Sequence, residues 1–506
     1  MIESSPPASP VELGAIPRAL PMWGKVIDQS RCIGCHACTT ACKSENEVPL
    51  SVTRTYVKSV DVGVFPQARR AFQVTRCNQC EDAPCVSACP TSAMYRRPDG
   101  IVDFDKAACI GCKACMAACP YDAIFINPED HSAEKCNFCA HRLEVGLEPA
   151  CVVVCPTEAL IVGDLNDPTS KVARIVNREP VTVRRPEKGT RPKVFYKGAH
   201  QATLDPIAAR RPDGGLYAWS QQPAGHQQVG SGHGGGPGNS SAAALLSYDV
   251  SHRAPWDWRV SAYTWTKGLA AGTYLAGLMI GAWGLWPVVT PLLAGIFLAL
   301  TGLLLISDLE HPLRFHYIFL RPQWRSWLVR GAVVISLYGL LLAAHLLLGL
   351  AGRADLARTL AFAGVPLAVL TAVYTAYLFA QARARDLWQS GLLAPHMLIQ
   401  ALVLGMAVYL LLGASQAAYA LTALVIVHLL LVTGELTIGH PTAHARQASH
   451  EMTSGRFARF FWAGIALALV AAAAPWLGPA AGVAALLAVL AHEHAYVQAG
   501  QSVPLA

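Results

Sequence analysis

Long apolar runs separated by short polar segments fill the second half of the chain, from about residue 260 onward. Eight of these runs are long enough, or nearly so, to cross a hydrocarbon core, which needs about 20 residues. They cover residues 267–286, 289–306, 328–350, 360–380, 396–413, 417–433, 459–475 and 477–497. One such run also fits a helix buried in a soluble core, but eight in succession do not. The pattern therefore predicts an all-α transmembrane bundle of eight helices.

The segments before this bundle have a different pattern and predict separate domains. Residues 1–20 contain no long apolar run. Residues 224–244 consist largely of Gly, Ser and His without periodicity, which is typical of a flexible linker. We therefore expect four regions, which are a disordered N-terminus over 1–20, a folded domain over 21–200, a flexible linker over 201–255 and a transmembrane domain over 256–506.

Composition and charge support a membrane protein. Hydrophobic residues make up 53% of the chain and charged residues only 14%, which is low for a soluble protein. If the N-terminus lies inside, the outer loops carry only Arg353 and Arg358, whereas the inner segments carry twelve positive residues. These are Arg253, Arg259, Lys267, Arg314, Arg321, Arg325, Arg330, Arg383, Arg385, Arg446, Arg456 and Arg459.

Positive loops stay in the cytoplasm, and this rule sets the expected orientation. We expect a multi-pass protein of the bacterial inner (cytoplasmic) membrane whose first half lies on the cytoplasmic side. The net charge of +7 follows largely from the same bias. No basic face is arranged for nucleic acid, so we expect no nucleic-acid partner.

All 16 cysteines lie between Cys32 and Cys155, in four groups of four. The groups are Cys32, Cys35, Cys38 and Cys42; Cys77, Cys80, Cys85 and Cys89; Cys109, Cys112, Cys115 and Cys119; and Cys136, Cys139, Cys151 and Cys155. The first and third read C-x-x-C-x-x-C-x-x-x-C, the spacing with which bacterial ferredoxins hold [4Fe–4S] clusters. A proline follows the last cysteine of groups two, three and four, as in ferredoxins, but not that of group one. The pattern predicts four [4Fe–4S] clusters.

Zinc and disulfide bonds are the two alternatives for these cysteines. Zinc ribbons use two well-separated pairs rather than three cysteines at every third position. Disulfides would require a secreted chain, and no signal-peptide pattern precedes Cys32. Both alternatives fit the sequence less well than iron–sulfur clusters.

In ferredoxins three thiolates of a group hold one cluster and the fourth crosses to another cluster. Groups two and three are adjacent, so we expect them to form one dicluster module, with groups one and four paired around it as a second. The resulting ligand sets are Cys77, Cys80, Cys85 and Cys119; Cys109, Cys112, Cys115 and Cys89; Cys32, Cys35, Cys38 and Cys155; and Cys136, Cys139, Cys151 and Cys42. The predicted fold of the first half is an α+β ferredoxin-like iron–sulfur domain.

Ionisable residues at membrane depth are costly, so each is a functional candidate. Asp308 and Glu310 close the second apolar run, followed by Arg314, and Glu435 ends the sixth. Lys267 begins the first. If the bundle binds a quinone, as the family resemblance given below implies, these five would hydrogen-bond it or deliver protons to it. The alternative is that they are interfacial charges that cap helices and pair with neighbouring arginines.

Histidines raise the question of haem, because histidine is a common ligand of haem iron. His345 lies toward the outer end of the third run and His428 toward the inner end of the sixth, so the two cannot hold one haem. His396, His428 and His494 are nearer to one another in depth. Lone helix histidines more often pack or form hydrogen bonds.

Both halves resemble known families. The first half resembles the four-cluster iron–sulfur subunit of molybdopterin oxidoreductases such as dimethyl sulfoxide, polysulfide and nitrate reductases, through RCIGCHACTTAC, RCNQCEDAPCVSACPTSAM and KCNFCAHRLEVGLEPACVVVCPTEAL. The second half resembles the NrfD/polysulfide reductase membrane subunit, through PWDWRVSAYTWTKGLAAGTYL and SDLEHPLRFHYIFLRPQWRSWLVRGA. Together the resemblance covers nearly the whole chain.

The resemblance implies a fused electron-transfer and membrane-anchor subunit that is not catalytic toward substrate by itself. Its clusters would link a cytoplasmic molybdopterin (bis-MGD) catalytic subunit to a quinone, ubiquinone or menaquinone, among the membrane lipids. By the same analogy, the group-three cluster lies nearest the membrane, the group-one cluster lies nearest the partner, and no haem is expected. Two alternatives stay open. One is a transmembrane, proton-translocating redox complex fed by another donor, such as a sulfur-metabolism partner, and the other is an anchor whose clusters only fold the domain.

Overall fold

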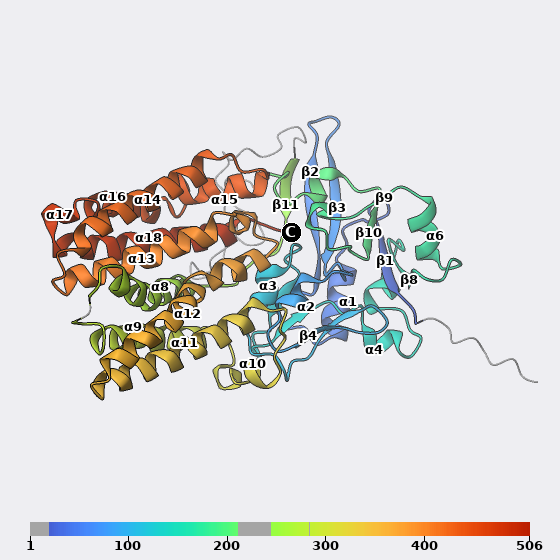
Figure 1. Ribbon diagram of the computed structural model, residues 1–506. Helices are drawn as coiled ribbons and strands as arrows, with labels where there is room; N and C mark the ends of the chain where they lie inside the picture. Colours follow the sequence, from blue (N-terminus) through green and yellow to red (C-terminus); the bar gives the residue numbers. More distant parts are fainter. Residues whose placement is uncertain (1–19, 211–243, 283) are drawn as a thin grey trace, which may run out of the picture.

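The computed structural model describes residues 20–210, 244–282 and 284–506. Figure 1 shows a domain of strands and short helices at the end of a long helical bundle. The expected disordered N-terminus, apart from Leu20, lies outside the described residues, as does the Gly-, Ser- and His-rich segment up to residue 243.

A four-stranded sheet forms the end of the first domain that lies away from the bundle (Figure 1). Its strands run in the order β8 (Leu160–Asp164), β1 (Trp23–Asp28), β10 (Val194–Lys197) and β9 (Val181–Thr182). The central strand β1 pairs antiparallel with β8 and parallel with β10. Helix α6 (Lys171–Arg178) packs Val172 and Ile175 against Val26 and Ile161 of this sheet. The Ser170 hydroxyl caps this helix by accepting from the Ala173 N–H.

The cysteines lie on short helices and on the loops beside them, and two hairpins follow the second and third of these helices. The helices are α1 (Ala37–Glu45), α2 (Pro84–Ala88), α3 (Ala114–Ala118), α4 (Ala140–Leu143) and α5 (Ala150–Val153). The hairpins are β4 (Met94–Arg96) with β5 (Val102–Phe104), and β6 (Ile124–Ile126) with β7 (Ala133–Lys135). Helix α2 is followed by the first hairpin and α3 by the second, which is a repeated unit. The predicted ferredoxin-like α+β domain is confirmed.

A second sheet joins the two halves of the chain. β11 (Ala244–Tyr248), which follows the Gly- and Ser-rich segment, pairs antiparallel with β2 (Thr55–Val62), and β2 pairs with β3 (Arg69–Arg76). Before that segment, α7 (Gln201–Leu204) packs against β2 and β3. The flexible linker predicted over 201–255 is therefore too long, because both of its ends are folded onto the first domain.

The bundle contains six helices that are long and apolar enough to cross a membrane, among the residues described. They are α9 (Val289–Ser307), α11 (Trp327–Leu350), α12 (Ala354–Gln381), α13 (Leu393–Leu411), α14 (Ala417–Thr437) and α18 (Pro479–Ser502). Helices α15 (Ala443–Thr453) and α16 (Ala458–Ala471) meet at 67° and would make a seventh span if counted as one. The predicted multi-pass bundle is present, but its count of eight is not reached by this measure. The short helices α10 (Tyr317–Leu320) and α17 (Ala474–Leu477) lie in connections.

Helix α8 (Trp258–Met279) differs most from the prediction, which began this element at residue 267. It is packed among α9, α12, α13 and α18 and is buried along most of its length. A Cβ on Gly272 would lie 1.7 Å from the Ala401 carbonyl oxygen, so α8 and α13 touch backbone to backbone. Because protein rather than lipid surrounds it, α8 tolerates polar residues near its start, and apolarity alone did not reveal that start.

Candidate functional site

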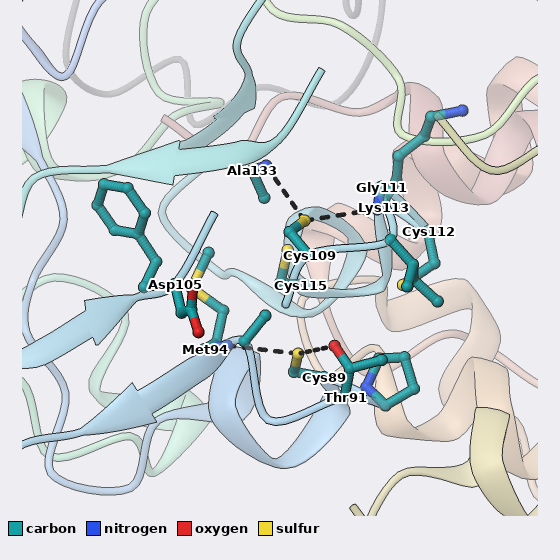
Figure 2. Close-up of a pocket in the computed structure, with 14 residues that line it drawn as sticks. Cys89, Thr91, Met94, Asp105, Cys109, Gly111, Cys112, Lys113, Cys115 and Ala133 are labelled. Carbon is teal, nitrogen blue, oxygen red and sulfur yellow. Dashed lines mark hydrogen bonds between the residues drawn. The ribbon is translucent and has the colours of Figure 1, made fainter. Parts of the chain in front are cut away.

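One cavity beside the helical bundle is lined by four cysteines, which are Cys89, Cys109, Cys112 and Cys115. We call it the membrane-side cavity. The Met94 N–H donates to the Cys89 sulfur at 3.4 Å. The Gly111 and Ala133 N–H groups both donate to the Cys109 sulfur at 3.4 Å. Figure 2 shows these donors aimed at the sulfurs. Backbone N–H groups in this arrangement favour thiolates and other anions.

The C-I-G-C-K-A-C loop takes this shape because two of its residues have left-handed backbone angles. Gly111 has a φ of +69°, close to the +71° of the equivalent Gly34, and Lys113 has a φ of +61°. Only glycine takes such an angle without steric cost. Space also requires glycine here, because a Cβ on Gly111 would lie 2.3 Å from the Cβ of Glu310 in the membrane half. The loop thus touches the second half of the protein directly.

A second cavity, which we call the distal cavity, is lined by Cys42, Cys136, Cys139 and Cys151. Side chains approach its sulfurs, and the Ala150 backbone N–H also acts on Cys139. Lys25 Nζ lies 3.5 Å and Arg76 Nη1 3.2 Å from the Cys151 sulfur. The Asn46 amide lies 3.7 Å from the sulfurs of Cys42 and Cys139.

These cations change the acidity of one thiol. Burial raises the pKa of Cys42 to about 12, as expected for a thiol removed from water. Burial also acts to raise the pKa of Cys151, but Arg76 and Lys25 outweigh it and lower that pKa to about 6. Among the described cysteines with a resolved shift, Cys151 alone moves in this direction. The distal cavity therefore favours negative charge at Cys151.

The other eight cysteines fall into two further sets. Burial raises the pKa of Cys80 to about 12, with Cys77 and Cys119 adding to the rise. The same neighbours and Cys80 act on Cys85, so these four lie together. At the far end, burial raises the pKa of Cys32, and Cys155 and Cys35 contribute. Cys35 is exposed, so this last set reaches the surface.

The arrangement of the thiols distinguishes a cluster from a single ion. Within residues 20–210, 244–282 and 284–506, no three His, Cys, Asp or Glu side chains are placed to hold one metal ion. A zinc site would bring its thiolates within about 2.3 Å of one point. Four thiols around a cavity, with N–H donors or cations directed at them, instead fit a [4Fe–4S] cluster, whose irons each bind a separate thiolate.

Three of the five predicted quinone-site residues hold the membrane-side cavity in place. The Lys113 ammonium lies 3.4 Å from an Asp308 carboxylate oxygen and 3.1 Å from one of Glu310. Arg314 donates to the carbonyl of Cys109 at 3.0 Å. The carboxylates thus pair with a lysine beside Cys112 rather than with arginines, which differs from the interfacial pairing considered above.

Two further residues on the same interface were not singled out from the sequence. The Trp256 indole N–H donates to the Cys112 carbonyl at 3.2 Å, and the Ser326 hydroxyl donates to the Ala88 carbonyl at 2.8 Å. Trp256 also stacks on Trp388, with ring centroids 5.7 Å apart. Both Trp256 and Ser326 lie within motifs quoted above, but nothing in the sequence places them beside cysteines more than a hundred residues away.

Lys267 lies in the interior of the bundle instead of at its edge. Its ammonium donates to the Ala372 carbonyl and to the Thr375 hydroxyl, both at 2.8 Å. Nearby, Glu493 of α18 accepts from the Thr264 hydroxyl at 2.6 Å. Glu493 was not singled out from the sequence, although it lies within the apolar run predicted over 477–497.

Glu435 lies apart from Lys267, next to a group of buried histidines. Its carboxylate is 4.0 Å from His396 Nδ1, and His396 Nε2 is 2.8 Å from His428 Nδ1. The third member is His492, with ring centroids 5.2 Å from both, rather than His494, which packs on Phe460. The direct contact between His396 and His428 leaves no room for an iron between those two nitrogens.

The structure therefore separates the five candidates. No hydrogen bond or ion pair among the described residues joins Lys267 or Glu435 to the Asp308, Glu310 and Arg314 group. His345 contacts Tyr274 at 3.3 Å in another part of the bundle.

Comparison with known families matches both halves. Residues 23–44 match a 4Fe-4S binding domain and residues 68–165 a 4Fe-4S dicluster domain. Residues 247–491 match the family described as polysulphide reductase, NrfD.

Several characterised proteins are similar to part of the chain. A tetrathionate reductase subunit of Salmonella typhimurium is 43% identical over 218 residues, covering 42% of this chain and 85% of that protein. A polysulfide reductase component of Wolinella succinogenes is 46% identical over 176 residues, covering 34% of this chain and 92% of that protein. Protein NrfC of Escherichia coli is 43% identical over 176 residues, covering 34% and 79%. Each match spans most of the relative but less than half of this chain.

Proposed function

The protein belongs to the family of iron–sulfur subunits that includes this tetrathionate reductase component, joined in one polypeptide to an NrfD-type membrane subunit. On that basis we propose that it carries electrons between a membrane quinone and a separate catalytic subunit. The iron–sulfur domain, the multi-pass bundle and the kinship with reductase subunits are its established features. The number of clusters, the quinone and the nature of the partner are the proposal.

The observation that carries this proposal is the contact between the membrane-side cavity and the bundle. Arg314 and Trp256, both from the membrane half, donate to carbonyls of the loop that bears Cys109 and Cys112. We propose that each of the four predicted ligand sets holds one [4Fe–4S] cluster. One-electron transfer is the chemistry that these clusters supply when bound. The chain's own residues would fix the membrane-side set against the bundle, at the end where a quinone is reached.

For the quinone itself, the ionisable residues of the bundle supply three candidate positions. Asp308 and Glu310 lie at the interface beside the membrane-side cavity. Lys267 is buried within the bundle and Glu435 is buried near the end of α14, and a buried ionisable group in a bundle marks a substrate or proton site by default. We propose that Asp308 and Glu310 orient the quinone near the cavity, and that Lys267 and Glu435 hold or transfer its protons.

The surface around α1 and α5 has the features of a docking surface for the catalytic subunit. Cys35 is exposed, and exposed apolar side chains lie on α5 and on the loops that flank α1 and α5, two helices that pack on each other. They are Ile33, Leu50, Leu147 and Val153, with exposed fractions of 51 to 96%. Contiguous exposed apolar side chains mark interaction sites. We propose a molybdopterin (bis-MGD) subunit as the occupant, by analogy with the reductases that this protein resembles.

The charge of the loops supports a cytoplasmic position for the iron–sulfur domain. Arg314 and Arg385, two of the twelve inner positive residues, face this domain or the C-terminal segment beside it. By the positive-inside rule, that side of the bundle is the cytoplasmic side. Protease accessibility of the domain in inside-out but not right-side-out vesicles is the expected result.

The full chain in lipid vesicles provides the test. After chemical reduction, electron paramagnetic resonance should detect four [4Fe–4S] signals, and added oxidised quinone should reoxidise them. Signals that stay reduced in the presence of quinone would leave only an anchoring role. Replacing Ile33 or Leu50 by Asp should weaken copurification with the catalytic subunit without loss of iron. Val64→Asp, on the β2–β3 turn, is the matched control because Val64 is comparably exposed but distant from the cysteines.

A second candidate, a proton-translocating complex, is favoured by one observation. Buried protonatable groups occur at more than one depth of the bundle, with Lys267 and Glu493 in one part and His345 with Tyr274 in another. Acidification or alkalinisation inside vesicles during quinone turnover would support this function. Turnover without such a change would exclude it.

A further inference from the structure

Two buried cations approach a single cysteine of the distal cavity. Lys25 of β1 is 0% exposed and Arg76, the last residue of β3, is 1% exposed. Both direct a nitrogen at the Cys151 sulfur, at 3.5 and 3.2 Å. The two cations come from strands of different sheets, so their meeting at one sulfur is a property of the fold.

Neither cation is neutralised by a carboxylate among the residues that the structure describes. The other contacts of Lys25 and Arg76 are the Phe138 ring, 4.9 Å from Lys25 Nζ, and the Thr55 hydroxyl, 3.0 Å from Arg76 Nη2. Arg54 lines the same cavity but is paired with Glu134 at 3.0 Å. A buried charge without a partner is costly. The negative charge that offsets Lys25 and Arg76 must therefore come from the Cys151 thiolate and from whatever it binds in the cavity.

The membrane-side cavity has the opposite balance. Its one lining cation, Lys113, extends away from the thiols (Figure 2) and is paired with Asp308 and Glu310. Asp105, a carboxylate, also lines this cavity. Neutral backbone N–H groups make the contacts to its sulfurs, apart from the Thr91 hydroxyl 3.9 Å from Cys89. Arg314 also carries a positive charge beside this cavity, but it donates to the Cys109 carbonyl rather than to a sulfur. Both cavities thus present four thiols, but only in the distal cavity do cations contact a sulfur directly.

Reduction of an iron–sulfur cluster adds one negative charge and needs no proton. A nearby cation stabilises this added charge, and net charge and hydrogen bonds to sulfur are recognised determinants of the reduction potential. We propose that Lys25 and Arg76 make the distal cavity a stronger electron acceptor than the membrane-side cavity. An electron given by a membrane quinol is then favoured at the distal cavity, on the way to an electron-accepting partner.

This inference deepens the proposed function and rests on it, because it assigns a direction to the same electron path. The protein would be biased to carry electrons outward from the membrane, as a quinol-oxidising reductase requires. Only one electron moves at each transfer, and no bond is formed or broken within the polypeptide. The quinol is the reductant, and the catalytic partner is the oxidant.

The test is a redox titration of the full chain, followed by electron paramagnetic resonance. Cys151→Ser and Cys112→Ser first identify the distal and membrane-side signals, because each should alter or remove one signal. The distal signal should have the higher midpoint potential. Lys25→Met and Arg76→Gln, which remove charge at similar size, should lower that midpoint and leave the membrane-side midpoint in place. Lys25→Arg keeps the charge and should preserve the wild-type value.

Each outcome of the titration either supports or overturns the proposed order of the two midpoint potentials. A distal midpoint at or below the membrane-side midpoint overturns the proposal, and so does a distal midpoint that neither charge-removing variant moves. If both of those variants fail to assemble, the order of the two wild-type signals still decides. Fewer than four clusters, or no reoxidation by quinone, would instead contradict the proposed function. The order of midpoints and the count of clusters are separate readouts, so the two failures can be told apart.

Discussion

The membrane-side and distal cavities each present four thiols, and they are held in different ways. Around the first, the membrane half donates hydrogen bonds to loop carbonyls, and the lining lysine is paired with carboxylates. Around the second, two cations without carboxylate partners among the described residues approach a sulfur directly. The cysteine motif therefore specifies what is bound, whereas residues outside the motif specify what each site does. Contacts with the bundle distinguish the membrane-side cavity, whereas cations beside a sulfur distinguish the distal cavity.

The largest expected effect comes from replacing one cysteine of each cavity, because each replacement should remove one cluster and leave the other. Cys112→Ala should remove the membrane-side cluster and stop quinone from reoxidising the clusters that remain. Cys151→Ala should remove the distal cluster and leave quinone able to reoxidise the membrane-side one. Each variant should lose about four iron atoms per polypeptide, measured by iron analysis and electron paramagnetic resonance. Equal loss of quinone reactivity in both would contradict the separation of roles.

Cys119→Ala tests the predicted crossing between groups in the same way. It should remove the cluster of Cys77, Cys80 and Cys85 and leave the membrane-side cavity loaded. Loss of the Cys109-group cluster instead would break the predicted ligand sets.

The next effect concerns the one neutralised cation of the distal cavity. Glu134 is buried and pairs with Arg54 at 3.0 Å. Glu134→Gln leaves Arg54 without a carboxylate partner and also removes the ion pair between Glu134 and Lys106. Breaking a buried ion pair from one side costs about 3–5 kcal/mol. We expect a lower midpoint of thermal unfolding and, because positive charge is released beside the cavity, a higher distal reduction potential. Asp61→Asn, in an exposed pair with Arg70, is the control and should change neither quantity measurably.

Beyond the membrane-side cavity, Glu435→Gln tests where protons are handled. If the Glu435 carboxylate passes protons to quinone, its loss should slow quinone turnover by about 100-fold or more, the usual contribution of a general acid or base. All four clusters should persist, as judged by their spectra. Asp308→Asn, beside the cavity, is the comparison that locates the site. If Glu435→Gln leaves turnover unchanged, Glu435 does not act on quinone, and Asp308 and Glu310 at the interface remain the candidates.

Much of the bundle could be predicted from apolar runs, because lipid-facing helices must be apolar along their whole length. The runs at 289–306 and 328–350 match α9 and α11 to within one residue at each end. Helix α8 was predicted with a late start because neighbouring helices, not lipid, cover Thr264, Thr266 and Lys267. The predicted linker was too long because β11 is only a short strand that pairs with a sheet formed nearly two hundred residues earlier.

The cysteine groups could be predicted because three of the four ligands in each predicted set lie close together in sequence, and their spacing follows from the shape of the loop. The residues around the cavities could not. Lys25 and Arg76 lie 126 and 75 positions along the sequence from Cys151, on strands whose residues give no sign of what they face. Trp256 likewise lies 144 positions from Cys112. Such contacts depend on how the sheets and the bundle pack, which periodicity does not encode.

The smallest expected effect comes from the hydrogen bond by which Trp256 joins the bundle to the membrane-side cavity. Trp256→Phe keeps an aromatic ring to stack on Trp388 but removes the hydrogen bond to the Cys112 carbonyl. A hydrogen bond of this kind contributes about 0.5–1.5 kcal/mol, so the thermal midpoint should fall only slightly. The membrane-side signal should change its line shape or midpoint, and the distal signal should not, because the bond ends on a loop of the membrane-side cavity alone. Trp256→Ala should cost about 3–5 kcal/mol by emptying the space between the loop and the bundle. If Trp256→Phe disturbed the distal signal as much as the membrane-side signal, the contact with the bundle would affect both cavities. The bundle contact would then not be specific to the membrane-side cavity.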